Sequence, residues 1–319
     1  MEKNSRIYVA GHRGLAGSAI VRRLQSAGYS NLITRTRQEL DLTDAHAVRR
    51  FFEEALPDYV FVAAARVGGI YANSAYCGDF IRENLQIQIN IIDQARRSGA
   101  KKLLFLGSSC IYPKHCPQPM KEEYLLSGAL EPTNEAYAVA KIAGITMCQT
   151  YKRQFGFNCI SLMPTNLYGP FDNFDLKNGH VLPALIRRFH EAKKSGAPHV
   201  AAWGSGSPMR EFLHADDLGD ACLFLMSNYD SEAIVNVGTG KEQSIKKLTE
   251  LVRHIVDYKG ELVWDATKPD GSPRKLLDIS RLANLGWRSK IDLEEGLTDT
   301  YRWYRENEHT ARGVAQGQA

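Results

Sequence analysis

The stretch RIYVAGHRGLAG at residues 6–17 decides the fold, because it joins a run of strand-forming residues to a glycine-rich turn. Residues 6–10 predict a strand, and residues 14–28 carry apolar side chains at helical spacing and predict a helix. Glycines between them let the backbone approach a pyrophosphate, and a helix N-terminus adds N–H donors. An ordinary strand-to-helix turn is the alternative. We therefore predict a dinucleotide-binding turn formed by Gly11, His12, Arg13, Gly14, Leu15, Ala16 and Gly17.

The rest of the first half alternates strand and helix patterns. Strands are predicted at residues 32–35, 59–63, 102–106 and 159–163, and helices at residues 44–56, 80–99 and 137–155. Strands separated by helices of this length pair in parallel through right-handed crossovers. The pattern predicts an α/β fold with a doubly wound parallel (Rossmann) sheet, whose ligands bind at the carboxyl ends of the strands.

The second half is broken by prolines and predicts shorter elements. Helices are predicted at residues 180–195, 216–226, 244–256 and 293–307, and strands at residues 200–203, 211–214, 234–237 and 261–264. We expect a nucleotide-binding domain at residues 1–165, to which residues 212–240 return. Residues 166–211 and 241–310 would form a smaller, discontinuous α/β substrate-binding domain. Residues 311–319 are small and polar, and they predict a flexible tail.

Composition excludes several classes of protein. The 319 residues are 44% hydrophobic and 24% charged, which argues against disorder. The net charge of +4 is too small to indicate a nucleic-acid partner. No apolar run approaches the roughly 18 residues of a membrane span. The six cysteines form no Cys-x-x-Cys pair, so we expect no metal site, and the start MEKNS lacks a signal-peptide core; both point to the cytoplasm.

The residues at the strand ends indicate which dinucleotide binds. An acidic residue after the second strand would favour NAD, but this chain has Arg35 and Arg37 there, and Arg13 in the turn. Guanidinium groups pair well with a phosphate dianion, so the sequence favours NADP(H). Asp41 is placed to contact the adenine edge. Further cofactor contacts are predicted after the fourth and fifth strands, at Leu106, Gly107, Ser108, Pro164, Asn166 and Leu167.

Three side chains suit the protonation of an alkoxide. Ser108 ends the fourth predicted strand, and Tyr137 and Lys141 are four residues apart on one helix face. A tyrosine of ordinary pKa, about 10, is a poor acid or base at neutral pH, but an ammonium nearby favours the phenolate. We expect Lys141 to lower the pKa of Tyr137, and Ser108 to hold a carbonyl oxygen beside the phenol.

These residues resemble the extended short-chain dehydrogenase/reductase superfamily. Longer strings are similar to its branch that epimerises and reduces GDP-4-keto-6-deoxy-D-mannose. They are AGHRGLAG (10–17), GSSCIYPK (107–114), EPTNEAYAVAKIAG (131–144), MPTNLYG (163–169), PMREFLH (208–214) and KPDGSPRKLL (268–277). The resemblance covers residues 6–307. The chain departs from it at Arg66, where lysine is expected, and around residues 171–177, in the loop that precedes a proposed catalytic residue.

The resemblance implies a two-step reaction that yields GDP-L-fucose. Cys110 would remove the protons on C3 and C5, which the C4 ketone acidifies, and His180 would return a proton to the opposite face. NADPH would then reduce C4 while Tyr137 protonates the oxygen; Lys141 and His180 would also contact the cofactor. A thiol and an imidazole are sensible partners near neutral pH. The implied contacts with the GDP-sugar are Asn166, Arg188, Trp203, Arg210 and Asp270.

Three other functions compete with this one. A 4-epimerase or 4,6-dehydratase usually retains NAD, and a dehydratase needs an acid and a glutamate where this chain has Ser109 and Cys110. A reductase of another GDP-keto-sugar would not need both Cys110 and His180. A non-catalytic NADP sensor would often lose Tyr137 and Lys141. The resemblance also implies a homodimer through the helices at 80–99 and 137–155, whose apolar stripes could equally be core.

Overall fold

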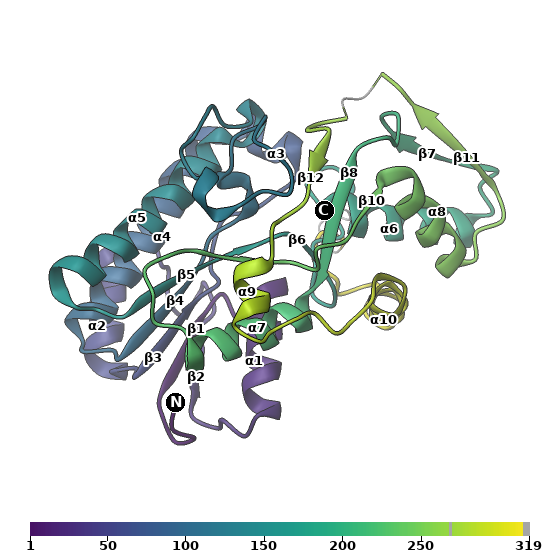
Figure 1. The fold of residues 1–319 in the computed structure, drawn as a ribbon. Helices are drawn as coiled ribbons and strands as arrows, with labels where there is room; N and C mark the ends of the chain where they lie inside the picture. The colour runs from purple at the N-terminus through teal and green to yellow at the C-terminus, as the bar shows by residue number, and fades with distance from the viewer. Residues whose placement is uncertain (268–269, 315–319) are drawn as a thin grey trace.

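A six-stranded parallel sheet forms the first half of the molecule in the computed structural model, which describes residues 1–267 and 270–314 (Figure 1). Its order is β2-β1-β3-β4-β5-β9, and every neighbouring pair is parallel. The strands are β1 (Ile7–Ala10), β2 (Leu32–Ile33), β3 (Tyr59–Val62), β4 (Lys102–Leu106), β5 (Cys159–Pro164) and β9 (Val235–Val237). The predicted doubly wound fold class is confirmed, although β2 ends two residues earlier than expected.

Alternation along the strands sends side chains into two cores. Tyr8 and Ala10 of β1 face α2 (Ala45–Ala55), α4 (Cys77–Arg97) and α5 (Glu135–Phe155). Ile7 and Val9 face α1 (Leu15–Ser26) and α7 (Ala215–Asn228) on the other side. Successive side chains of a strand point to opposite faces, and here both faces are covered by helices. Apart from β2 and Tyr59 of β3, which are half-buried, the strands are therefore buried, and their ends are what remains available for ligands.

The second half packs around a separate core, drawn on the right of Figure 1. Strand β8 (Met209–His214) pairs with β6 (Asn166–Tyr168), β10 (Glu242–Ser244) and β12 (Arg274–Lys275), and β7 (His199–Trp203) pairs with β11 (Glu261–Asp265). The helices of this half are α6 (Val181–Ser195), α8 (Ile245–Val256) and α10 (Leu293–Glu306). Short elements that we did not predict are α3 (Ile70–Ala75), α9 (Ser280–Asn284), β6, β10 and β12. The division into two domains with the boundaries given above stays a prediction.

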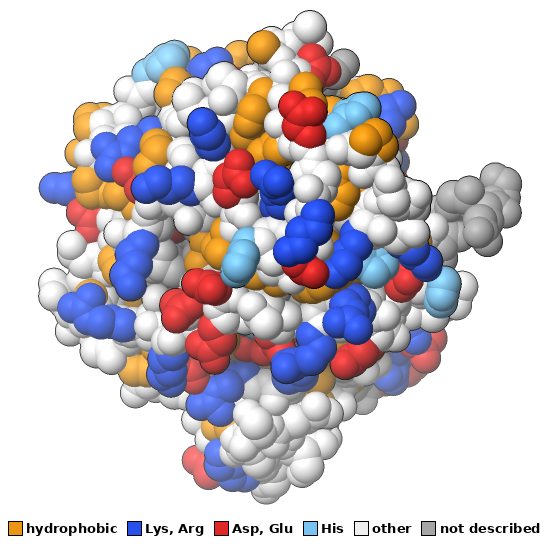
Figure 2. All heavy atoms as spheres, turned by 90° about the vertical axis from the view of Figure 1, so that its right-hand side faces the viewer, with side chains coloured by type: hydrophobic (Ala, Val, Ile, Leu, Met, Phe, Trp, Pro, Cys, Tyr) orange, Lys and Arg blue, Asp and Glu red, His pale blue; other side chains and the backbone are white. Residues whose placement is uncertain are grey.

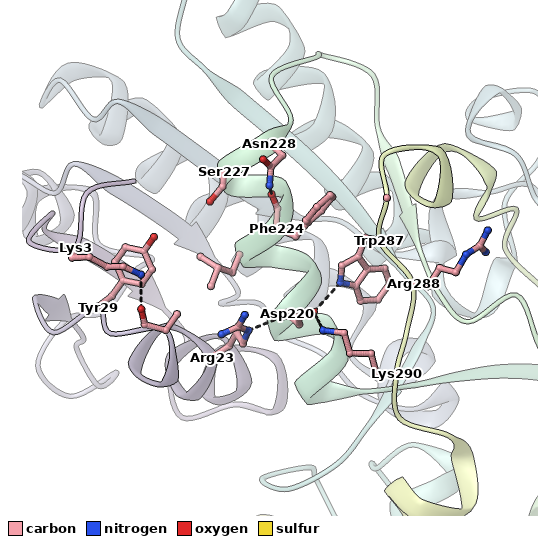
Figure 3. Close-up of a pocket in the computed structure, with 13 residues that line it drawn as sticks. Lys3, Arg23, Tyr29, Asp220, Phe224, Ser227, Asn228, Trp287, Arg288 and Lys290 are labelled. Carbon is pink, nitrogen blue, oxygen red and sulfur yellow. Dashed lines mark hydrogen bonds and ion pairs between the residues drawn. The ribbon is translucent and has the colours of Figure 1, made fainter.

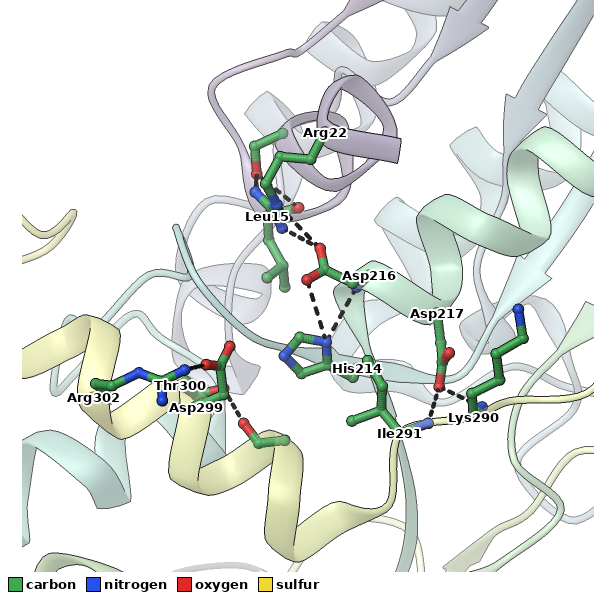
Figure 4. Close-up of polar contacts among 12 residues, drawn as sticks. Leu15, Arg22, His214, Asp216, Asp217, Lys290, Ile291, Asp299, Thr300 and Arg302 are labelled. Atoms are coloured by element: carbon green, nitrogen blue, oxygen red, sulfur yellow. Dashed lines mark hydrogen bonds and ion pairs between the residues drawn. The ribbon is translucent and has the colours of Figure 1, made fainter. Parts of the chain in front are cut away.

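Polar contacts tie the two halves together where β8 meets α7 (Figure 4). Arg22 of α1 forms an ion pair with Asp216 of α7, and its Nε lies 3.1 Å from the carboxylate. The Asp216 backbone N–H donates to Nδ1 of His214 at 3.2 Å, so the buried His214 caps α7. Asp217 accepts a hydrogen bond of 3.0 Å from the backbone N–H of Lys290. These contacts hold α7, which follows β8 directly, against α1 and against the segment at Lys290.

The surface of the second half mixes charges of both signs. Figure 2 shows Lys and Arg interspersed with Asp and Glu over this face. Among the described residues, the structure contains no helix with the length and apolar character needed to span a membrane.

The predicted flexible tail is wrong for residues 311–314. Ala311 is 1% exposed and belongs to the core of the second half. The carbonyl of Arg312 accepts from the backbone N–H of Phe174 at 2.8 Å, and that of Gly313 accepts from Arg187 at 2.9 Å. These residues pack because the core of the second half buries Ala311, and because Phe174 and Arg187 donate hydrogen bonds to the backbone carbonyls that follow it. Residues 315–319 of this prediction lie outside the described part of the chain.

Glu211 is the central polar group of the second half and is fully buried. One carboxylate oxygen accepts from the backbone N–H groups of Thr239 and Gly240 at 2.6 and 2.7 Å, and the other accepts from that of Leu277 at 3.0 Å. Burial raises the pKa of Glu211, and these hydrogen bonds act in the opposite direction. A single side chain of β8 thus satisfies donors from two other segments.

We predict that Glu211→Ala lowers the free energy of unfolding by roughly 3 kcal/mol, because it leaves the buried N–H of Leu277 and the part-buried N–H groups of Thr239 and Gly240 without their acceptor. Urea unfolding followed by circular dichroism measures this change. The control is Glu53→Ala on α2, whose carboxylate is 61% exposed beside Arg49 and should cost less than about 0.5 kcal/mol. Equal effects of the two substitutions would contradict this role of Glu211.

Candidate active site

A cavity of about 670 Å³ lies between the two halves, at the carboxyl ends of β1, β4 and β5. This is the edge at which parallel sheets of this topology bind ligands. Its wall brings together residues from the first half with residues of α6, β7 and β8 in the second half. Most predicted site residues line it, and the exceptions lie in the glycine turn.

The glycine turn is shaped by close backbone contacts. Gly11 has φ +84°, and a Cβ on it would lie 2.7 Å from the backbone nitrogen of Ala64. A Cβ on Gly17 would lie 2.1 Å from the Gly11 carbonyl, so this glycine serves the packing of α1 against the turn. The cavity is lined by Gly11, Gly14, Leu15 and Ala16, whereas His12, Arg13 and Gly17 do not line it although they too are described.

Two arginines after β2 reach the cavity. Arg35 and Arg37 line it together with Asp41, while Arg13 lies away from it and is exposed. The Arg35 guanidinium lies 5.5 Å from the centre of the Phe51 ring. Asp41 accepts from the backbone N–H and hydroxyl of Thr43 at 2.9 and 2.8 Å, and these bonds lower its pKa. The cavity wall at this end is therefore cationic, with one carboxylate held by its own turn.

Ser108, Tyr137 and Lys141 meet at the end of β4. The Ser108 hydroxyl accepts from the backbone N–H of Cys110 at 3.2 Å and begins a short 3₁₀ turn. Lys141 is 3% exposed, donates to the Leu106 carbonyl at 2.7 Å, and lies 5.8 Å from the centre of the Tyr137 ring. All three predicted catalytic residues line the cavity, as do the predicted cofactor contacts Leu106, Gly107, Pro164, Asn166 and Leu167.

Burial controls the ionisation of this group. The pKa of Tyr137 is raised, first by burial and then by the nearby charge of Cys110, and a hydrogen bond with Ser108 opposes the rise. The pKa of Lys141 is lowered by burial to about 7. The expected lowering of the Tyr137 pKa by Lys141 is thus wrong for the protein alone. A buried ammonium that loses its own proton near neutral pH cannot strongly favour a phenolate.

Cys110 and His180 face the same cavity from opposite halves. The Cys110 sulfur accepts a hydrogen bond from Nδ2 of Asn134 at 3.3 Å and is half-buried. His180 precedes α6 at its N-cap position, and among the described contacts its side chain makes no capping bond. The His180 imidazole is exposed to the cavity, and protein surrounds the cavity. The surrounding protein reduces the hydration of the imidazolium, which lowers the pKa of His180. The Cys110 sulfur and the His180 imidazole thus line one cavity.

The predicted sugar-nucleotide contacts also line the cavity. The Arg188 guanidinium lies 4.8 Å from the centre of the Trp203 ring. Burial lowers the pKa of Arg188 and of Arg210, although Asp270 and Cys110 oppose the shift at Arg210. Asp270 accepts two hydrogen bonds of 2.7 Å from Ser205, which restrains the loop after Trp203.

Asn166, which is predicted to border both ligands, donates to the Glu211 carbonyl at 2.8 Å. This bond fixes its side chain to β8. Lys268 and Pro269, which precede Asp270 in one of the resembling strings, lie outside the described residues.

Sequence reasoning assigned no role to several polar residues of the cavity wall, among them Asn134, Asp172 and Arg312. Burial raises the pKa of Asp172 to about 7, and the charge of Arg312 opposes this rise. Asn134 lies three residues before Tyr137, inside a string that we had quoted, so its position could have drawn attention to it. Arg312 belongs to the tail that was expected to be flexible, and no local pattern indicates that it reaches the cavity.

A second groove lies away from this cavity, beside α1 and α7 (Figure 3). Its polar groups largely bind one another: Asp220 accepts from Arg23 at 2.7 Å and from both Trp287 and Lys290 at 3.0 Å. The Asp220 carboxylate thus holds the segment between Trp287 and Lys290 against α7. The polar contacts of this groove therefore stabilise the packing of α1, α7 and the segment at residues 287–290.

Known proteins resemble the chain in sequence and in structure. Residues 7–238 match the NAD dependent epimerase/dehydratase family. A protein of Arabidopsis thaliana named putative GDP-L-fucose synthase 2 is 62% identical over 307 residues, which are 96% of this chain and 94% of that protein. A GDP-6-OMe-4-keto-L-xylo-heptose reductase from C. jejuni has a TM-score of 0.92 and 41% identity, covering 96% of this chain and 99% of that one. A GDP-L-fucose synthetase from Naegleria fowleri bound to NADP has a TM-score of 0.91 and 30% identity, and the match covers 98% of this chain and 96% of that one.

We predict that Lys141→Met stabilises the ligand-free protein at and below pH 7, and that this gain shrinks as the pH rises. Below pH 7 Lys141 is charged in both the folded and the unfolded protein, so the full free-energy cost of burying its ammonium group opposes folding. Between pH 7 and the unfolded pKa of 10.5 the folded state loses the proton first, and the penalty falls. The difference in unfolding free energy should fall by about 1 kcal/mol per pH unit in this window.

Urea unfolding from pH 6 to pH 9 checks this dependence. Lys247→Met on exposed α8 is the control and should show a small difference that does not change with pH. A constant gap between Lys141→Met and the unchanged protein would mean that Lys141 stays charged after folding, against this prediction.

Proposed function

Because the chain belongs to the NAD-dependent epimerase/dehydratase family and, within it, to the GDP-L-fucose synthases, we propose that it converts GDP-4-keto-6-deoxy-D-mannose into GDP-L-fucose. It epimerises C3 and C5 and then reduces the C4 ketone. One observation carries this proposal: the pair Cys110 and His180 lines the same cavity as Ser108, Tyr137 and Lys141. A reductase needs only Ser108, Tyr137 and Lys141, whereas an epimerase needs an acid and a base such as Cys110 and His180.

The residues present fit NADP(H). Gly14, Leu15 and Ala16 line the cavity where α1 begins, so a pyrophosphate can lie against the turn and the start of α1. At the other end of the wall, Arg35 and Arg37 would hold the phosphate on the adenosine ribose, and Asp41 would lie beside the adenine. Lys141 and Asn166 would border the nicotinamide end. When bound, NADPH supplies a hydride to C4 of the sugar.

Epimerisation uses Cys110 and His180 in turn. The C4 ketone acidifies the protons on C3 and C5. The Cys110 thiolate takes one of these protons, and the electron pair of the C–H bond moves to the ketone oxygen to form an enolate. His180, as an imidazolium, returns a proton to the opposite face of the same carbon, and the ketone re-forms with inverted configuration. Exchange of both groups with solvent resets them for the second carbon.

Reduction uses the residues at the end of β4. Ser108 holds the C4 oxygen, and Tyr137 gives its hydroxyl proton to that oxygen as the C–H bond forms at C4. The raised pKa of Tyr137 keeps this proton in place until it is needed. Lys141 would hold the ribose beside the nicotinamide, and its pKa of about 7 would let it pass a proton toward Tyr137 near neutral pH.

Substrate binding is assigned to the second half. Arg188 and Arg210 would hold the diphosphate of the GDP-sugar, and the Trp203 ring would pack on the base or the sugar. Asp270 would border the same site. The alternative of a reductase for another GDP-keto-sugar draws support from the 41% identity with the heptose reductase, but the presence of both Cys110 and His180 favours the two-step reaction.

Two further proposals concern the setting of the reaction. A base role for Cys110 needs a free thiol, and all six cysteines are free in the structure, which supports a cytoplasmic enzyme. We also propose a homodimer through α4 and α5, where Ile89, Val139 and Phe155 remain exposed.

We predict that the product formed in deuterated buffer from GDP-4-keto-6-deoxy-D-mannose and NADPH carries deuterium at C3 and C5. Proton NMR of the product and the fall of NADPH absorbance measure the two steps. Cys110→Ser should reduce deuterium uptake by at least 100-fold, since a hydroxyl is a far weaker base at neutral pH. Cys77→Ser is the control, because Cys77 is exposed at the start of α4 outside the cavity.

Reduction without deuterium would indicate a 4-keto reductase and would overturn the roles of Cys110 and His180. NADPH binding with neither step would indicate the sensor.

We predict that Arg37→Ala weakens NADPH binding about tenfold and leaves NADH binding unchanged, because one phosphate contact of a guanidinium is worth about 1.4 kcal/mol. Titration calorimetry with each cofactor measures both constants. Arg50→Ala on the exposed side of α2 is the matched control. An equal loss for NADH would show that Arg37 binds a part common to both cofactors.

A further inference from the structure

We propose that Asn134 is a positioning residue that holds Cys110 in the orientation of a base and stabilises its thiolate through a hydrogen bond from Nδ2. This inference rests on the proposed function, because it explains how the thiol of an epimerase is activated. The observation behind it is the contact of 3.3 Å between Nδ2 of Asn134 and the sulfur of Cys110.

The position of Asn134 favours this role over helix capping. Asn134 occupies the N-cap of α5, where asparagine normally accepts hydrogen bonds from the first turn. In the described structure its side chain makes no capping bond and turns to the sulfur instead. Its Oδ1 is buried and has no hydrogen-bond partner among the described residues. The amide therefore forgoes the usual helix contact in favour of the cavity.

The backbone around Asn134 is held firmly. Its N–H donates to the Glu131 carbonyl at 3.1 Å within the short 3₁₀ turn that precedes α5. The Glu131 carboxylate is buried and binds Lys114 at 3.1 Å and the Ser272 hydroxyl at 3.3 Å. Asn134 is thus fixed between this cluster and the helix that carries Tyr137. A fixed donor can restrain the sulfur without losing much entropy of its own.

A neutral donor suits this position. The ionisable groups that interact with Cys110 are Tyr137 on α5 and Arg210 on β8. The Arg210 cation favours the thiolate, while a phenolate at Tyr137 would oppose it. An amide N–H stabilises the thiolate but cannot give up its proton at neutral pH. Asn134 therefore supports the base without competing with the substrate as a proton donor.

The test is the rate at which iodoacetamide alkylates Cys110 in the ligand-free protein between pH 6 and pH 10.5. Mass spectrometry of the peptide that contains Cys110 separates it from the other five cysteines. Only the thiolate reacts, so the rate reports its fraction. We expect Asn134→Ala to react about tenfold more slowly at pH 7, and the rates to converge above pH 10. Convergence distinguishes ionisation from a change of access.

Two more variants keep the test independent of folding. Asn134→Asp has the same shape but places a carboxylate beside the sulfur, so Cys110 should react more slowly than in Asn134→Ala at pH 7. Asn134→Gln keeps an N–H donor and should recover part of the rate. Asn228→Ala, at the exposed end of α7, is the control and should match the unchanged protein. Identical pH profiles for the unchanged protein and Asn134→Asp would overturn the proposal.

A second measurement separates this inference from the proposed function. In the deuterium experiment, Asn134→Ala should slow uptake at C3 and C5 about tenfold, in step with the loss of alkylation. If the unchanged protein takes up no deuterium, the proposed function fails, while the alkylation series still decides whether Asn134 stabilises the thiolate. If uptake is normal in Asn134→Ala and alkylation is unchanged, the inference fails and the function stands.

Discussion

The buried carboxylate of Glu211 is the contact on which the arrangement of the cavity depends. It accepts hydrogen bonds from the segments at residues 239–240 and 277, and the carbonyl of the same residue accepts from Asn166. Arg210 precedes it on β8 and lines the cavity. The Glu211 side chain therefore fixes β8 to the segments at residues 239–240 and 277, and its backbone carbonyl fixes β8 to Asn166, which follows β5. A buried acceptor with several donors tolerates little movement, because each lost bond leaves a polar group without water.

Enclosure of the cavity has a second consequence, which is chemical. The same burial that excludes water raises the pKa of Tyr137 and lowers those of Lys141 and His180. All three are thereby biased toward their neutral forms in the protein alone. A neutral phenol can give a proton, and a lysine with a pKa of about 7 can exchange one near neutral pH. The ionisation of the site therefore follows from its closure, and charges brought by bound phosphates would change it further.

Parts of this site could be predicted because their signals are local. The periodicity of α1, α2, α4 and α5 and the runs of β-formers in β1, β3, β4 and β5 are long enough to be recognised, and Tyr137 and Lys141 share a face by spacing alone. Strands of two or three residues such as β6, β10 and β12 carry no such signal, because pairing with β8 rather than propensity makes them strands. The tail failed for the same reason, since Ala311 is buried by residues distant in the chain.

The sequence by itself determined the doubly wound sheet and the glycine turn, and it supplied the candidates for the proton-transferring side chains and the two arginines after the second strand. Only the tertiary structure decided that Arg35 and Arg37 reach the cavity while Arg13 does not, that Asn134 turns to Cys110 instead of capping its helix, and that burial rather than Lys141 governs the pKa of Tyr137. The physical reason is one of range. Backbone propensity and periodicity act over a few residues, whereas burial, electrostatic environment and side-chain direction are set by neighbours that the chain brings together from far apart.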